Sequence, residues 1–173
     1  YGDLVVGDKD AVMIASRILG YGKNYKFIYG GETTTVDLST LENKPFDTTL
    51  IEPYKNEFKY TLPNTGTNLT FKILTDSDEK KIAAELEGLK KIKKEGSPVI
   101  TTRLKYLITS IEGNYDVKTI RDFVDSSKFL APDSRALRDY IRQVQPGVDL
   151  TFFPDGSDKA VSIPIGFDFF WPE

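Results

Sequence analysis

Three acidic residues form the group in this sequence that is best placed for carboxylate chemistry. Asp76, Asp78 and Glu79 lie within one short stretch. Such a group could bind a hard cation or act as a general acid and base. The same residues open a segment of helical periodicity, and an acid in the first turn of a helix gains about 0.3–1 kcal/mol from the macrodipole. We therefore interpret them as helix-capping residues, and we interpret Asp8 and Asp10 in the same way.

The sequence contains no histidine and no cysteine. Imidazole general bases, thiolate nucleophiles, disulfides and the usual zinc ligands are therefore all missing. Thr101-Thr102-Arg103 and Asp133-Ser134-Arg135 each place a hydroxyl beside an arginine, but no base stands next to the hydroxyl to activate it. We interpret both as helix-start motifs whose arginines can pair with carboxylates. The sequence predicts no catalytic residues, metal site or cofactor, and we expect neither an enzyme nor a small-molecule substrate.

The charge distribution does not favour binding to nucleic acid or to a membrane. The chain has 23 basic and 26 acidic residues, which give a formal charge of -3. The lysines of its densest basic segment are interspersed with glutamates, which is typical of a solvated helix face with ion pairs. The alternative is that these lysines bind an acidic groove on a partner. This segment contains Lys80, Lys81, Lys90, Lys91, Lys93 and Lys94. No apolar run approaches the ~18–20 residues of a spanning helix, so we expect a soluble protein.

Four aromatic residues stand close together at the end of the chain, in Phe167-Asp168-Phe169-Phe170-Trp171-Pro172. They could form a last core strand, or they could anchor a partner, because large aromatic side chains on an extended segment often become interface hot spots. We predict that Phe167 and Phe169 close the core and that Phe170 and Trp171 contact a neighbour. The full set of predicted interface residues is Phe167, Phe169, Phe170, Trp171, Pro172, Arg135 and Arg138.

Helical patterns occupy the middle of the chain and one segment near its start. The first expected helix covers residues 11–19, ends before Gly20, and has apolar residues nearly all round its axis, which predicts burial on more than one side. The others are expected to start at residue 76 and continue into the lysines, to cover residues 98–111, to follow Asp116, and to cover residues 131–144.

Alternating patterns and turn residues predict three β-hairpins. They join residues 25–29 to 33–38, residues 57–62 to 68–74, and residues 148–153 to 159–163. The predicted fold is α+β, a central bundle of about four to five helices flanked by N-terminal, middle and C-terminal hairpins. We expect a single domain over residues 1–173, with residues 1–74 mainly β with one N-terminal helix, residues 75–147 helical, and residues 148–173 forming a hairpin and the aromatic tail.

Several short motifs in a fixed order carry a resemblance to a known family. They are Gly7-Asp8-Lys9-Asp10-Ala11, Arg17-Ile18-Leu19-Gly20-Tyr21-Gly22, Leu62-Pro63-Asn64-Thr65-Gly66, Thr101-Thr102-Arg103-Leu104, Asp133-Ser134-Arg135-Ala136-Leu137-Arg138 and the Phe-Phe-Trp-Pro ending. The chain, from residue 3 to residue 172, resembles tail proteins of contractile-tailed bacteriophages related to the baseplate hub assembly proteins of T-even phages. The resemblance implies a non-enzymatic baseplate or hub component, made in the host cytoplasm, located in the virion tail and bound to other tail proteins.

The chain departs from this family in its terminal hairpins. Many members carry Cys-Pro-x-Cys-Gly knuckles there, which together form a four-cysteine zinc ribbon. Phe153-Pro154-Asp155-Gly156 and Tyr29-Gly30-Gly31-Glu32 stand at these places in this sequence. We expect the two hairpins to form a degenerate, metal-free ribbon held by Tyr29, Phe152, Phe153 and their neighbours, each contributing ~1.5–3 kcal/mol when buried.

Other functions remain as alternatives to a structural subunit. The nearest is a transient hub assembly chaperone that is not retained in the virion. A carboxylate-dependent hydrolase would need two acids roughly 5–10 Å apart in a cleft. A nucleic-acid-binding module would need a basic face and salt-sensitive binding.

Overall fold

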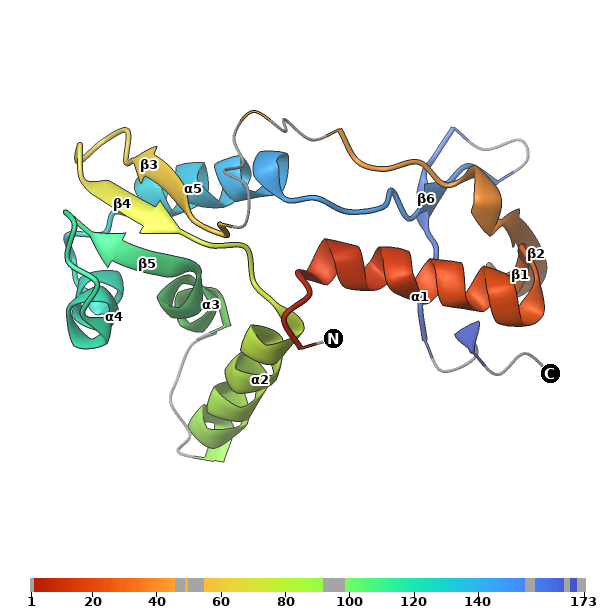
Figure 1. The fold of residues 1–173 in the computed structure, drawn as a ribbon, viewed down its shortest axis with the longest axis horizontal. Helices are drawn as coiled ribbons and strands as arrows, with labels where there is room; N and C mark the ends of the chain where they lie inside the picture. The colour runs from red at the N-terminus through yellow and green to blue at the C-terminus, as the bar shows by residue number, and fades with distance from the viewer. Residues whose placement is uncertain are drawn as a thin grey trace. The chain divides into compact units, whose positions relative to one another are not determined.

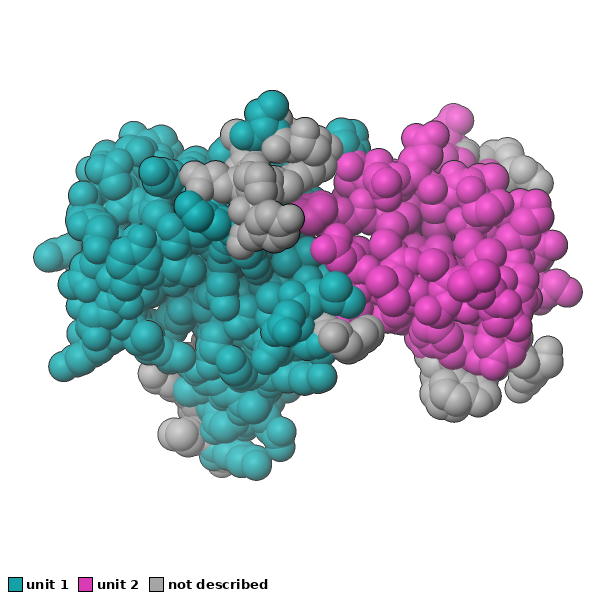
Figure 2. Space-filling model, in the orientation of Figure 1, with its two compact units in different colours: residues 1–6, 45–145 teal, residues 7–44, 146–173 magenta. Residues whose placement is uncertain are grey.

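The computed structural model describes residues 2–45, 49, 55–91, 99–154, 158–166 and 169–170. These residues form the α+β structure that the sequence predicts, with five α-helices and small antiparallel sheets of two or three strands (Figure 1). They fall into two compact units, shown in different colours in Figure 2. Unit 1 comprises residues 1–6 and 45–145, and unit 2 comprises residues 7–44 and 146–173. One domain over residues 1–173 stays a prediction, since two compact units of a chain can fold jointly or separately.

The sheet of unit 1 has three antiparallel strands in the order β3 (Phe58–Thr61), β4 (Asn68–Phe71) and β5 (Ile108–Ile111). The hairpin of β3 and β4 confirms the sequence prediction, with strands shorter than expected. Gly66 in its turn has a φ of 69°, a conformation that glycine adopts without steric cost.

Unit 1 also contains four helices, α2 (Asp76–Lys91), α3 (Val99–Leu107), α4 (Val117–Asp125) and α5 (Ala131–Val144), and α2 packs on α3. Figure 1 shows α5 along β3 and β4, and α3 and α4 beside β5. The ring of Tyr140 on α5 stacks on Tyr60 at 4.8 Å and meets Phe71 edge-on at 5.9 Å. Among the described residues, sixteen buried apolar side chains form a core to which both the sheet and the helices contribute.

The strand β5 corrects one prediction. The sequence predicts a helix over residues 98–111, but α3 ends at Leu107 and the next four residues pair with β4. Ile108 and Ile111 fit the helical spacing of the preceding leucines, yet this stretch is rich in β-branched residues, which favour a pleated surface. The pairing also satisfies the hydroxyl of Thr70, which lies 2.7 Å from the hydroxyl of Ser110. Tertiary pairing thus outweighs the local helical pattern.

Unit 2 contains α1 (Val6–Tyr21) except for its first residue, the hairpin of β1 (Asn24–Tyr29) and β2 (Glu32–Asp37), a 3₁₀ turn (Leu38–Thr40), and the short strands β6 (Thr151–Phe152) and β7 (Val161–Ser162). Both terminal hairpins are confirmed. Gly30 and Gly31 connect β1 to β2 with φ angles of 61° and 88°, as a two-residue turn of this kind requires.

The first helix differs from its prediction in length and in burial. It starts at Val6, so Asp8 lies in its first turn, and it continues through Gly20 to Tyr21. It is not buried on more than one side: Val12 is 45% exposed and Leu19 is 88% exposed. The small core of unit 2 takes up one face of the helix only.

Gly7 lies directly against the backbone of residues 146–147. A Cβ atom at this position would lie only 2.6 Å from the carbonyl carbon of Pro146 and 2.8 Å from the Cα of Gly147. The same segment accepts a hydrogen bond of 2.8 Å from the Lys44 amide to the Gly147 carbonyl. Gly7 therefore lets the start of α1 pack directly on the backbone at residues 146–147, which a side chain would prevent.

Candidate partner-binding sites

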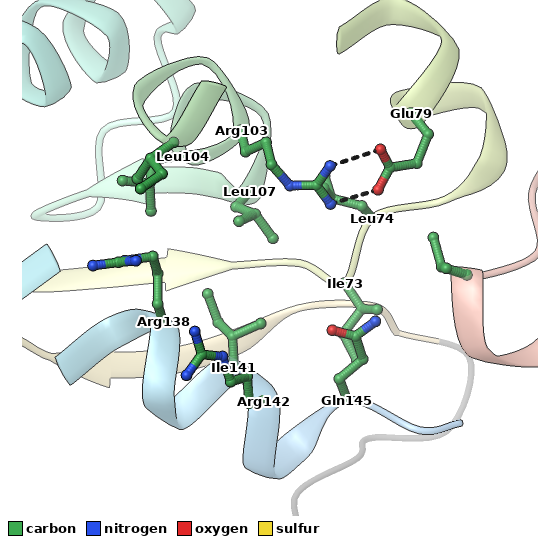
Figure 3. A pocket seen from close by; sticks show the side chains of 12 residues that line it. Ile73, Leu74, Glu79, Arg103, Leu104, Leu107, Arg138, Ile141, Arg142 and Gln145 are labelled. Carbon is green, nitrogen blue, oxygen red and sulfur yellow. Dashed lines mark hydrogen bonds and ion pairs between the residues drawn. The ribbon is translucent and has the colours of Figure 1, made fainter. Parts of the chain in front are cut away.

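A cavity of about 190 Å³ lies within unit 1 between α3 and α5 (Figure 3). We call it the α3–α5 cavity. Leu104 and Leu107 of α3 and Ile141 of α5 line it, together with Ile73 and Leu74 between β4 and α2. Charged side chains stand beside this apolar lining, namely Glu79, Arg103, Arg138 and Arg142. The cavity therefore combines an apolar interior with an excess of positive charge.

Arg103 and Glu79 form a bidentate ion pair at the cavity. The Arg103 guanidinium donates to both carboxylate oxygens of Glu79, at 2.8 and 2.6 Å, and so joins α3 to α2 (Figure 3). This confirms that the arginine of Thr101-Thr102-Arg103 is used for carboxylate pairing. Parallel double contacts of this type are among the strong hydrogen bonds of proteins. The guanidinium of Arg103 is therefore already paired with a carboxylate of the chain.

Arg138 is one of the predicted interface residues, and it lies at this cavity. Its side chain is half-buried, and its Nε donates to the Ser134 carbonyl at 3.2 Å. No carboxylate in the described part of the chain is within ion-pairing distance of it. Arg142, one turn later, pairs with Asp139 at 3.1 Å, but both side chains of this pair are more than half exposed. Arg138 can thus accept an acidic partner without breaking an ion pair.

Arg135, the other predicted interface arginine, lies at a different place on α5. It is exposed and lines a second hollow with Ala131, Pro132, Ala136 and Asp139. The structure therefore does not bring Arg135 and Arg138 together in one site.

Asp133 has a structural role that the sequence does not reveal. Its side chain is fully buried at the start of α5 and accepts hydrogen bonds from the amide and the side chain of Asn64, both at 2.8 Å, and from the Thr65 amide at 3.2 Å. Burial opposes ionisation of this carboxyl, but the hydrogen bonds from Asn64 and Thr65 outweigh it and hold the pKa of Asp133 below its ordinary value. Two of the motifs in the family resemblance thus meet at one buried carboxylate.

Of the three acids at the start of α2, Asp78 caps the helix as the sequence predicts, whereas Glu79 pairs with Arg103 and Asp76 with Lys80. Asp78 accepts a hydrogen bond from the Thr75 amide at 3.1 Å, while the Thr75 hydroxyl accepts one from the Asp78 amide at 3.2 Å, which is a reciprocal capping box. Along the same helix Lys80 pairs with Asp76 and Lys91 pairs with Glu87, each one turn apart. The prediction of a helix face with ion pairs is confirmed for these residues, whereas Lys93 and Lys94 lie outside the described residues.

The aromatic tail is described only in part. Phe169 is completely buried in the core of unit 2, where its ring meets Tyr25 at 4.8 Å. Phe170 is partly buried and packs on Phe169 at 5.1 Å. The side chain of Phe169 therefore closes the core, as predicted, and is not available at the surface. Phe167, Trp171 and Pro172 lie outside the described residues, so their interface role stays a prediction.

The two terminal hairpins meet through aromatic rings. Phe152 of β6 packs edge-on against Phe27 at 5.4 Å and against Tyr29 at 6.3 Å, both on β1. The prediction that Phe153 shares in this packing is wrong, because its side chain is 64% exposed. The rings explain how the hairpins are held together, while their relation to a zinc ribbon stays a prediction.

Arg17 is a buried charge in unit 2 that the sequence does not indicate. It is 3% exposed, and it donates to the Gly22 carbonyl at 3.1 Å, just beyond the end of its own helix. Its guanidinium also lies over the rings of Tyr21 and Tyr25, at 5.0 and 5.9 Å from their centroids. Carbonyls at a helix C-terminus and aromatic faces both favour a cation, so Arg17 acts as the C-terminal cap of α1.

The two units differ in the balance between buried and exposed apolar side chains. Among the residues described, unit 2 buries six in its core, which are Ile14, Tyr25, Val36, Leu38, Ile163 and Phe169. It leaves six large ones exposed, which are Val12, Leu19, Tyr21, Ile28, Tyr29 and Phe153. Unit 1 buries sixteen and exposes five, which are Val99, Ile100, Tyr115, Val117 and Leu130. Unit 2 thus has a much larger share of its apolar side chains in solvent.

Comparison of the chain with protein-family models, with curated proteins and with solved structures gives no match. No helix within the described ranges is long and apolar enough to cross a membrane. Over the same ranges, no group of three or more acidic, histidine or cysteine side chains could hold a metal ion.

Proposed function

We propose that this protein is a structural or assembly component of the tail baseplate or hub of a contractile-tailed bacteriophage, and that it acts through contacts with other tail proteins. The proposal starts from the ordered motifs that resemble baseplate hub assembly proteins. The observation that carries it in the structure is the set of exposed apolar side chains in unit 2: among the described residues, six large ones lie in solvent and six are buried in the core.

This balance favours a protein that is completed by its partners. Leu19 and Ile28 are 88% and 77% exposed, although both belong to regular elements of unit 2. Burying one such side chain against a partner contributes about 1.5–3 kcal/mol, so a few of them can supply a large part of an interface. A unit with a small core also gains stability from binding, since a partner that binds only the folded state stabilises it.

The residues behind the resemblance also have structural roles in this chain. Gly7 permits a close backbone approach, Arg17 caps its own helix, and Asp133 holds the turn at Asn64. Each role depends on the residue type found there. These roles give a physical reason why the motifs would occur together in proteins that share this fold.

The test is to locate the protein in tail assembly. Mass spectrometry of purified virions and of isolated hub intermediates would measure its copy number in each. A fixed copy number in virions supports a structural subunit, and presence on intermediates alone supports a transient assembly chaperone. Absence from both particles and intermediates would contradict the proposal.

A further inference from the structure

The α3–α5 cavity has the apolar interior of a binding site. Leu104, Leu107 and Ile141 are buried at its wall, with exposed fractions of 3%, 8% and 7%. Ile100 also lines it and is 47% exposed, so an apolar side chain stands where the cavity meets solvent. An aliphatic or aromatic group that entered here would leave water and contact apolar atoms on several sides.

The size of the cavity favours a protein side chain over a whole small molecule. Its volume is about 190 Å³. Pockets that enclose cofactors and drug-sized ligands commonly measure ~300–1,000 Å³ and surround most of the ligand. A cavity below that range suits one or two side chains of an approaching polypeptide, which is how an anchor residue enters a pocket on its partner.

The charges at the cavity favour an acidic partner. Three arginines and one glutamate line it, and the glutamate is already held by Arg103. Arg138 has no carboxylate partner in the described chain. The Arg142–Asp139 pair is exposed and single, and such surface pairs contribute only about 0–1 kcal/mol, so Arg142 can exchange its partner at little cost. An incoming carboxylate can therefore form a charge-assisted pair with Arg138 and a second contact with Arg142.

We propose that the α3–α5 cavity is a docking site for a segment of another tail protein. In that segment an apolar side chain stands next to an aspartate or glutamate. The apolar side chain fills the space between Leu104, Leu107 and Ile141, and the carboxylate pairs with Arg138. This inference rests on the proposed function, since it takes the neighbour to be a protein of the same assembly.

The test uses a short peptide as the probe. An acetylated and amidated Gly-Leu-Glu-Leu-Gly peptide is titrated into the full isotope-labelled chain, and amide chemical shifts are followed by NMR. We expect saturable shifts at Leu104, Leu107 and Ile141. Peptides with Gln in place of Glu, or with Ser in place of Leu, should bind about tenfold more weakly or not at all, since each loses one of the two contacts.

Two variants on α5 supply the comparison. R138E should weaken binding of the Leu-Glu-Leu peptide at least about tenfold, while R135Q, on the same helix but at the second hollow, adds no carboxylate next to Arg138 and should leave binding unchanged. Ile100→Glu is a further variant, because its exposed position tolerates a charge and the new carboxylate should repel the peptide at the mouth of the cavity. It keeps the test valid if R138E does not fold.

Several results would overturn the inference. They are equal binding by the R135Q and R138E variants, equal binding of the Glu and Gln peptides, shifts that map away from the cavity, and no binding at all. Octanoate, a small molecule with an apolar chain and a carboxylate, tests whether the occupant is a small molecule. Tighter binding of octanoate than of the peptide would reject a protein segment as the occupant.

Incorporation into tails is measured separately, so a chain that is incorporated but binds no peptide refutes the docking site alone. A chain that binds the peptide but never joins a tail refutes the proposed function alone.

Discussion

Unit 1 and unit 2 are stabilised by different kinds of contact. Among its described residues unit 1 has sixteen buried apolar side chains, and bidentate arginine–carboxylate pairs join its helices, Arg103 with Glu79 and Arg121 with Glu85. Unit 2 has six in the part that the structure describes, and its elements meet mainly through aromatic rings. A small core loses a larger fraction of its stability with each contact removed. We therefore expect unit 2 to be the less stable unit and the one that depends more on a partner.

The largest expected effect is the loss of the central ring of unit 2. Phe169→Ala removes a completely buried side chain that contacts Tyr25 and Phe170, and we expect a loss of about 3–5 kcal/mol. Native-state hydrogen exchange should show that the amides of β1 and β2 lose protection while those of β4 keep it. Phe153→Ala, at an exposed position, is the control and should change stability by less than about 0.5 kcal/mol. Equal loss of protection in β4 would show that the two units do not differ as proposed.

Two glycines of α1 provide a comparison within unit 2. Gly7→Ala would place a Cβ against the backbone of Pro146 and Gly147, and we expect it to cost about 1–3 kcal/mol as an overpacked contact. Gly20→Ala should instead stabilise the helix by up to about 1 kcal/mol, because nothing lies near a Cβ added there. Hydrogen exchange of the α1 amides measures both changes. If the two substitutions shift protection in the same direction, the close approach at Gly7 is not a constraint.

The polar ties of unit 1 can be tested at Glu85. This carboxylate accepts two hydrogen bonds from Arg121, at 2.9 and 2.8 Å, and one from the Tyr106 hydroxyl at 2.9 Å, so it joins α2, α3 and α4. Glu85→Gln should cost about 1–2 kcal/mol at pH 7, less than a fully buried pair because both partners are partly exposed. Glu87→Gln on the same helix is the control, since its pair with Lys91 is largely exposed.

The cost of Glu85→Gln should also depend on pH. The hydrogen bonds from Arg121 outweigh burial and hold the pKa of Glu85 below its ordinary value. The folded state therefore binds fewer protons than the unfolded chain near the ordinary glutamate pKa of about 4.3. The stabilisation is complete above that pH and is lost as the pH falls through the lower pKa of the folded state. Urea denaturation at pH 7 and pH 3 should show the difference between Glu85→Gln and the unmodified chain shrinking in acid, and a difference that grew would refute this account.

The sequence predicts local structure better than it predicts the sites. Turn glycines, helix caps and alternating patterns depend on neighbours in sequence, so the hairpins at Gly30 and Gly66 and the cap at Asp116 are found correctly. The strand β5 is missed because its pairing with β4 joins distant segments. The same holds for Asp133, whose three donors lie about seventy positions away. Local sequence patterns do not indicate either of these long-range contacts.

The α3–α5 cavity is missed for a related reason. The sequence predicts an interface role for Arg138, but only the fold brings it beside Leu104 and Leu107 and leaves it without a carboxylate partner among the described residues. Arg135 belongs to the same motif but lines another hollow. Residues three apart on an α-helix point about 60° apart around its axis, which is enough for them to contact different neighbours. A charged residue can be proposed for an interface from its sequence, whereas its place in a particular site requires the fold.

The smallest expected effect on folding concerns the exposed apolar side chains of unit 2. Leu19→Ser and Ile28→Ser should each change the free energy of unfolding by no more than about 0.5 kcal/mol, because both side chains are mostly in solvent. If they are buried in the assembled tail, each substitution should weaken incorporation when it competes with the unmodified chain, since about 1.5–3 kcal/mol of burial is lost. Val117→Ser, at an exposed position of unit 1, is the matched control. Equal incorporation of all three variants would mean that the exposed side chains of unit 2 are not contact residues, and the difference between the units would then concern stability alone.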